Sequence, residues 1–172
     1  LLIGGCDKNM PRQIINPKIR TGEEITFFIA ADPHHLSKST YTEGKAFEWF
    51  LNSGDGKLLT YTDEIIDAFI LDIKVKKPDV LIIPGDLTCN GERESHLEMV
   101  EKLKKIEGLG VPVYVIPGNH DIDNPWARHY TGDEMIRIDS ISPDEFLELY
   151  SPFGYDEAIY RDKDSLSYLA AP

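Results

Sequence analysis

Three apolar segments of strand length run directly into clusters of side chains that can bind metal ions. Open α/β sheets bind their ligands just outside the carboxyl ends of the strands. If the three segments are parallel neighbours in one sheet, their carboxylates, imidazoles and amide converge on one place, where they suit Mn, Fe or Zn. The pattern therefore predicts a metal site at one edge of a sheet. The segments and clusters are residues 25–31 with Asp32-Pro33-His34-His35, residues 79–84 with Gly85-Asp86, and residues 111–117 with Gly118-Asn119-His120-Asp121.

The segments between these expected strands have the spacing of amphipathic helices. The first helix is expected to begin at Thr62 or Asp63 as its capping residue and to end before Pro78. The second is expected over about residues 92–107, with Asn90 as its cap. Strands and helices then alternate as β-α-β-α-β, which predicts an α/β fold with a parallel sheet and right-handed crossovers. The side chains expected to face inward from the second helix are Leu97, Val100, Leu103 and Ile106.

Each expected strand is an almost continuous run of Val, Ile, Leu or Phe, and such strands are usually covered on both faces. Shorter elements are expected outside this core. They are a short helix at about residues 43–51, a helix that begins near Ser142, and a hairpin whose strands flank residues 161–165. Residues 126–130 are interpreted as a loop, and His96 is expected at the surface of the second helix.

The composition fits one globular domain, because the 172 residues are 41% apolar and 28% charged. The formal net charge is −12. An acidic surface repels a phosphate backbone, so binding to a nucleic-acid duplex is not expected. A small anionic substrate is compatible with this charge, since bound cations can dominate the potential inside a site.

Residues 1–24 are interpreted as a lead-in that precedes the domain. Residues 1–6, Leu-Leu-Ile-Gly-Gly-Cys, resemble the lipobox of bacterial lipoproteins, in which the cysteine carries the lipid. The polar stretch up to Glu24 would then tether an extracytoplasmic, membrane-anchored lipoprotein through lipid at Cys6. The alternative is that the apolar start is an ordinary strand of a cytoplasmic protein. No segment of the chain approaches the roughly 20 apolar residues of a membrane-spanning helix.

Taken in order, the three ligand clusters resemble the motifs of the calcineurin-like metallophosphoesterases. The longer stretches 85–92 and 118–125 look most like the branch that includes the class III cyclic-nucleotide phosphodiesterases. The resemblance is close over about residues 25–130. It implies half of the family's two-sheet α/β/β/α sandwich, with helices outside. The matching motifs are Asp32-x-His34, Gly85-Asp86 and Gly118-Asn119-His120-Asp121.

The resemblance also implies a role for each matching residue in a centre of two divalent metal ions. Asp32 and His34 would bind the first metal, Asp86 would bridge both, and Asn119 would bind the second through its amide oxygen. His120 would contact the phosphate and protonate the leaving oxygen, since an imidazole exchanges protons near neutral pH. A pair of metals can clamp the attacking and leaving oxygens of an in-line displacement. The expected activity is hydrolysis of a small phosphodiester such as a cyclic nucleotide.

Two other functions fit the same motifs. One is a phosphomonoesterase, and the other is a catalytically inactive surface protein that keeps the fold for binding. Arg128 could reach the substrate phosphate, or it could belong to an ordinary packed loop. Asp121 is expected to orient its neighbours, and His35 is expected to support the site indirectly or to be exposed.

The chain departs from the family pattern in its later part. Members normally carry a further histidine and then a Gly-His-x-His motif, which complete both metal shells. Here the last of the five histidines is His129, and no Gly-His-x-His occurs. Residues 25–172 are therefore expected to be the amino-terminal part of a metallophosphoesterase domain. Alone, this chain is expected to be inactive, to hold metal weakly, and to associate with itself through an uncovered part of the sheet.

Overall fold

The computed structural model describes residues 22–54 and 56–170. Cys6 and most of the expected lead-in lie outside the described residues. Within the described part of the chain, no helix is both long enough and apolar enough to cross a membrane.

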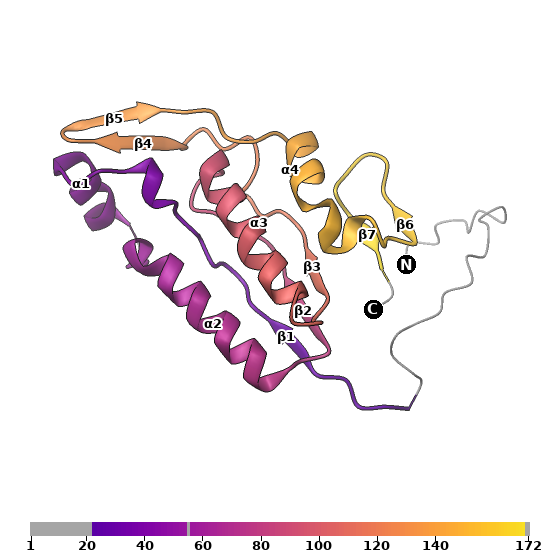
Figure 1. The fold of residues 1–172 in the computed structure, drawn as a ribbon. Helices are drawn as coiled ribbons and strands as arrows, with labels where there is room; N and C mark the ends of the chain where they lie inside the picture. Colours follow the sequence, from indigo (N-terminus) through magenta and orange to yellow (C-terminus); the bar gives the residue numbers. More distant parts are fainter. Residues whose placement is uncertain (1–21, 55, 171–172) are drawn as a thin grey trace.

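A parallel sheet of three strands lies at the centre of the fold, as the sequence predicts (Figure 1). The strands are hydrogen-bonded in the order β1-β2-β3, and Leu81 of β2 is the register partner of both Phe28 and Val113. Because all three strands run in one direction, their carboxyl ends lie along the same edge. The bounds are β1 (Phe27–Ile29), β2 (Val80–Ile83) and β3 (Val113–Val115).

Two crossover helices, α2 (Thr62–Lys76) and α3 (Arg93–Glu107), connect the strands and lie side by side over one face of the sheet (Figure 1). The ring of Phe28 in β1 stacks on Phe69 of α2, with 6.4 Å between the ring centroids. Burial of this apolar surface is the main force that holds the helices to the sheet. The β-α-β-α-β prediction is thus confirmed. The buried side chains of this core include Ile66, Ile73, Leu81, Ile83, Leu103, Ile106, Val113 and Val115.

The other face of the sheet is covered only in part. The expectation that every strand is covered on both faces is wrong for β1, because Phe27 is 46% and Ile29 is 69% exposed. Cover on this face lies against β3, where the Tyr168 hydroxyl donates to the carbonyl of Val115 at 3.1 Å. The irregular helical segment η3 (Ser151–Tyr155) packs against β3 as well. Nothing in the described residues reaches far enough to cover the outer side of β1.

The helix starts differ from the sequence-based expectations. Neither Thr62 nor Asp63 caps α2, since the capping position is Tyr61 and makes no side-chain hydrogen bond there. The Thr62 hydroxyl instead accepts from the amide of Leu36. The capping position of α3 is Glu92 rather than the expected Asn90, and it also lacks a side-chain cap.

The buried stripe of α3 also differs from the expected one. Leu97 is 44% exposed, whereas His96, which was expected at the surface, is fully buried. The stripe is centred on His96, Met99 and Leu103, and Leu97 lies on the opposite side of the helix at 100° per residue. Val100 at the edge of the stripe is buried as predicted.

A second, smaller core joins α1 (Lys45–Ser53) to the hairpin of β4 (Arg128–Thr131) and β5 (Glu134–Arg137). Tyr130 of β4 lies against Phe47 and Phe50 of α1, with ring centroids 5.7 and 4.7 Å apart. The interpretation of residues 126–130 as a loop is wrong, because β4 begins at Arg128.

The remaining elements largely follow the predictions. The helix expected near Ser142 begins there, since its hydroxyl accepts from the amide of Glu145 in a capping box. The expected late hairpin and the short helix α1 are also present. The bounds not yet given are η1 (Lys38–Thr40), η2 (Leu59–Tyr61), α4 (Pro143–Tyr150), β6 (Tyr160–Arg161) and β7 (Tyr168–Leu169).

Candidate metal centre

The loops that follow β1 and β2 run beside each other and carry the first expected ligands. The amide of His34 donates to the carbonyl of Asp86 at 3.0 Å, and the amide of His35 donates to Leu87 at 2.9 Å. Three expected ligands have left-handed backbone conformations, with φ of 57° at Asp32, 43° at His34 and 51° at Asp86. Asp and His tolerate this region better than most residues, and such backbone strain clusters at functional sites.

Two glycines bring the loops after β2 and β3 into direct backbone contact. A Cβ built at Gly85 would lie 2.9 Å from the Cα of Gly118. A Cβ at Gly118 would collide with the carboxylate and the amide nitrogen of Asp86. Only residues without a side chain permit this approach, which explains the glycines that precede Asp86 and Asn119.

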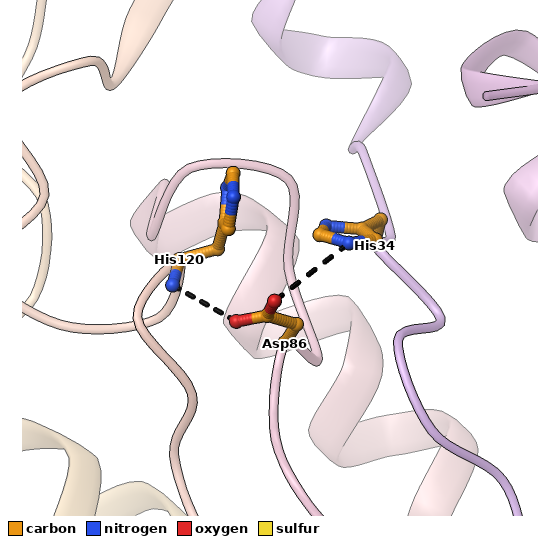
Figure 2. Close-up of side chains that lie close together, drawn as sticks. All are labelled: His34, Asp86 and His120. Carbon is orange, nitrogen blue, oxygen red and sulfur yellow. Dashed lines mark hydrogen bonds and ion pairs between the residues drawn. The ribbon is translucent and has the colours of Figure 1, made fainter. Parts of the chain in front are cut away.

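His34, Asp86 and His120 come together at the carboxyl ends of the three strands (Figure 2). Each offers one ligand atom, and these atoms all lie within 4.8 Å of one another. The Asp86 Oδ1 accepts from the His120 amide at 2.9 Å, while Asp86 Oδ2 lies 3.8 Å from His34 Nε2. The exposed carboxylate of Asp32 lies 3.9 Å from the same nitrogen.

The donor atoms around His34 fit a divalent cation. Distances of 3.8 and 3.9 Å are too long for hydrogen bonds. Two atoms bonded to one cation at about 2.1 Å lie at most about 4.2 Å apart, so the spacing suits ligands of a shared ion. Neither ring nitrogen of His34 has a hydrogen-bond partner among the described residues, and Nδ1 is buried. Burial, followed by the charge of Lys57, lowers the pKa of His34 and favours the neutral imidazole that binds metals.

The structure places His120 and Asn119 differently within one loop. The His120 Nδ1 lies 2.6 Å from the Cys89 carbonyl, and because a carbonyl only accepts, Nδ1 carries the proton and donates. His120 Nε2 is then the nitrogen that can exchange a proton. Asn119, between Gly118 and His120, has an exposed side chain. Of the expected residues, Asp32, His34, Asp86 and His120 are therefore brought together, with Asn119 beside them.

Asp121 fastens the two ligand loops to each other. Its fully buried carboxylate accepts from the amides of Gly118 at 2.8 Å and Leu87 at 3.1 Å through Oδ2. Through Oδ1 it accepts from both the amide and the hydroxyl of Thr88 at 2.9 Å. Burial raises the pKa of Asp121, and these hydrogen bonds oppose that rise. The contacts agree with the expected orienting role.

Two buried histidines support the ligand loops, His96 from α3 and His35 from the loop after β1. The Nε2 of His96 donates to the carbonyl of Asp121 at 2.9 Å, and Nδ1 accepts from the Tyr150 hydroxyl at 2.8 Å. His35 is fully buried beside Glu98, with 2.8 Å between Nε2 and the carboxylate. His35 thus supports the site indirectly. For His96, the sequence contains no indication of a buried role other than the position of this residue in the helix.

Two cationic side chains lie close to the centre. Lys57 is near enough to His34 to lower its pKa, and it lines a pocket together with His120. Arg128 lines the same pocket, and its Nη1 donates to the carbonyls of Pro125 at 2.9 Å and Ala127 at 2.8 Å. No simple motif marks Lys57, because it lies in the irregular connection between α1 and η2.

Comparison with known families agrees with this geometry. A model of the calcineurin-like phosphoesterase family matches residues 25–169, which is most of the chain. The chain therefore belongs to the calcineurin-like phosphoesterases, and the resemblance found in its motifs is confirmed. Membership implies divalent metal ions, which the donor set at His34, Asp86 and His120 suits.

A short segment of the chain is also similar to a curated protein. A segment of 45 residues is 49% identical to a protein of Arcobacter nitrofigilis described as a probable glycerophosphodiester phosphodiesterase GpdQ. The matched segment covers 26% of this chain and 15% of the relative. This similarity concerns a short part of both proteins.

Proposed function

We propose that the protein hydrolyses phosphoesters with a centre of two divalent metal ions. The observation that carries the proposal is the convergence of Asp32, His34, Asp86 and His120 at the carboxyl ends of three adjacent parallel strands. Their distances suit shared ligation, and the family to which the chain belongs is one of phosphoesterases.

Each residue has a distinct task in this proposal. Asp32 and His34 would hold one ion, Asp86 would be shared by both ions, and Asn119 would contribute its amide oxygen to the second. When bound, Mn, Fe or Zn ions supply a nucleophile from water at neutral pH and neutralise charge on the phosphoryl group. His120, with Nδ1 held by the Cys89 carbonyl, delivers a proton from Nε2 to the leaving oxygen.

The proposed substrate is a small phosphodiester such as a cyclic nucleotide. The stretches 85–92 and 118–125 support this choice by their resemblance to cyclic-nucleotide phosphodiesterases. The relative described as a glycerophosphodiester phosphodiesterase supports diester over monoester chemistry. Arg128 lines a pocket with His120 and is proposed to contact the substrate phosphate.

Two substitutions separate the proposed roles. Asp86→Asn is expected to abolish diester hydrolysis and to remove bound metal, because the bridging charge is lost. His120→Ala is expected to keep its metal and to lose about 10²–10⁴-fold in kcat. The control is Asp164→Asn, since this carboxylate is exposed in the β6–β7 loop.

Activity and metal content should be measured on the same samples, the latter by elemental analysis. Equal loss of metal in the Asp86 and His120 variants would contradict the separate roles. Faster turnover of phosphomonoesters than of diesters by the wild type would establish a phosphomonoesterase instead. Metal binding without turnover of either class would establish an inactive binding protein.

A further inference from the structure

A pocket of about 690 Å³ opens beside the candidate metal centre. His120 and Asn90 form its wall toward the metal ligands. The other walls come from α1, from the connection around Lys57 and from the β4–β5 hairpin. The pocket is therefore continuous with the place where a substrate phosphate would be bound.

Four aromatic side chains, two of them tryptophans, line this pocket. Phe50 and Tyr130 line it and are stacked on each other, with centroids 4.7 Å apart and 22° between the ring planes. Trp49 and Trp126, the two tryptophans of the chain, also line it and are 59% and 67% exposed. Neither tryptophan stacks on another aromatic ring within residues 22–54 and 56–170. Large apolar rings that remain exposed beside a reactive centre are available to a ligand.

The charge of the pocket contrasts with that of the whole chain. The chain has 30 acidic and 18 basic residues, yet no Asp or Glu is among the described residues that line the pocket. Lys57 and Arg128 both line it. The Arg128 guanidinium lies 5.8 Å from the centroid of the Trp126 ring. The pocket therefore combines positive charge for an anion with flat apolar surface for an organic group.

We infer that this pocket receives the organic part of the substrate and selects phosphodiesters that carry a flat aromatic ring, such as a nucleobase. The inference rests on the proposed function and assigns the selection of its substrate to the rings of this pocket. Every nucleobase has a face that can stack on Trp49 or Trp126, whereas a glycerol group has none. Lys57 and Arg128 hold the phosphate end, so ring and phosphate are bound at the same time.

Binding can be measured without turnover, because both tryptophans of this chain are in the pocket. Adenosine 5′-monophosphate and glycerol 3-phosphate both carry a phosphate group, but only the first carries an aromatic ring. The adenosine compound is expected to quench tryptophan fluorescence and to bind at least about tenfold more tightly in the presence of Mn²⁺. Trp126→Leu and Trp49→Leu each leave one reporter and are expected to remove most of that preference.

The matched control is Tyr160→Leu, which changes an exposed aromatic residue outside the pocket. It should leave both ligands unaffected. Trp49 and Trp126 are more than half exposed, so the fold should survive their substitution, and circular dichroism checks this. Equal affinity for the two ligands in the wild type, or an equal loss for both in the tryptophan variants, would overturn the inference.

Measurements of turnover distinguish this inference from the proposed function. The ratio of kcat/KM for 3′,5′-cyclic AMP to that for glycerophosphoethanolamine should fall about tenfold in Trp126→Leu relative to the wild type. An unchanged ratio with active enzyme would overturn the ring-binding role and leave the hydrolase intact. Absence of hydrolysis with intact ring-dependent binding would overturn the hydrolase and leave the pocket.

Discussion

At the scale of single residues, the chemistry of this protein depends on side chains that the backbone holds in uncommon conformations. Asp32, His34 and Asp86 each have positive φ, and Gly85 and Gly118 allow the loops to touch. The four expected ligands or catalytic groups that converge were recognisable because each follows an apolar run. The sequence could not reveal Lys57, because only the path of the α1–η2 connection brings it to His34.

The Asp121 carboxylate is expected to stabilise the geometry of the metal centre through its hydrogen bonds rather than to contribute charge to the centre. In Asp121→Asn one acceptor becomes an NH₂ group that faces a donor, which leaves a buried amide of Leu87, Thr88 or Gly118 unpaired. The expected cost is about 1–3 kcal/mol of unfolding free energy, together with weaker metal binding as the loops separate. Urea denaturation and metal titration check this.

Asp123→Asn provides the isosteric control for that variant. Asp123 is two residues further along the same loop, and its side chain is exposed. Its substitution should change neither stability nor metal affinity. An Asp121 variant as stable as the control would show that the loops do not depend on this carboxylate.

At the scale of elements, the beginning of α3 carries two buried titratable groups, Glu92 and His96, whose pKa values are shifted in opposite directions. Burial raises the pKa of Glu92 to about 7 and lowers that of His96 to about 4. Both groups are thus favoured as neutral in the fold. The stabilising contribution of Glu92 is present below its unfolded pKa of about 4.5 and is lost as the pH rises through about 7. That of His96 is present above about 6.5 and is lost as the pH falls toward about 4.

The variant Glu92→Gln should expose the first of these effects. The neutral amide does not ionise in this pH range. The free energy of unfolding of the variant should therefore rise relative to that of the wild type as the pH increases from 5 to 8, by up to about 3 kcal/mol. Urea denaturation at several pH values without added metal measures the difference. The exposed Glu94→Gln is the control, and a Glu92→Gln difference that is constant with pH would contradict the shifted pKa.

The sequence predicted the elements of the core better than those around it. Uninterrupted apolar runs predict β1, β2 and β3, and the helical spacing of apolar residues predicts α2 and α3. The β4–β5 hairpin lacks such a signal, because every residue of β5 is exposed and the hairpin is stabilised by Tyr130 against α1. The turn Gly132-Asp133 was the available clue. The exposure of β1 could not be predicted, since it depends on which distant segment covers that face.

At the scale of the whole molecule, the exposed face of β1 should cause the isolated chain to associate. Phe27 and Ile29 present apolar surface on an edge strand, and such edges pair with other chains. The 172-residue chain is expected to sediment as a mixture of monomer and larger species. Ile29→Lys should shift it toward monomer, whereas Val75→Lys, on an exposed position of α2, should not.

Attachment to a membrane through lipid at Cys6 also concerns the whole molecule, and it stays a prediction. If Cys6 carries lipid, the native protein should appear in the membrane fraction of its bacterial host. Cys6→Ser should release it, while Cys89→Ser leaves the distribution unchanged, because Cys89 is buried. Equal distribution of wild type and Cys6→Ser after fractionation would contradict lipidation.

The pocket carries Lys57 and Arg128 and no acidic side chain among its described lining residues, within a chain of net charge −12, and this contrast affects the rate at which substrate is captured. An anion approaching from a distance meets the repulsive field of the whole surface before it meets Lys57 and Arg128. Salt screens long-range fields within about 10 Å at 0.1 M, whereas contacts inside the pocket are screened less. Association should therefore become faster as moderate salt is added, the reverse of electrostatic steering, and dissociation should change little.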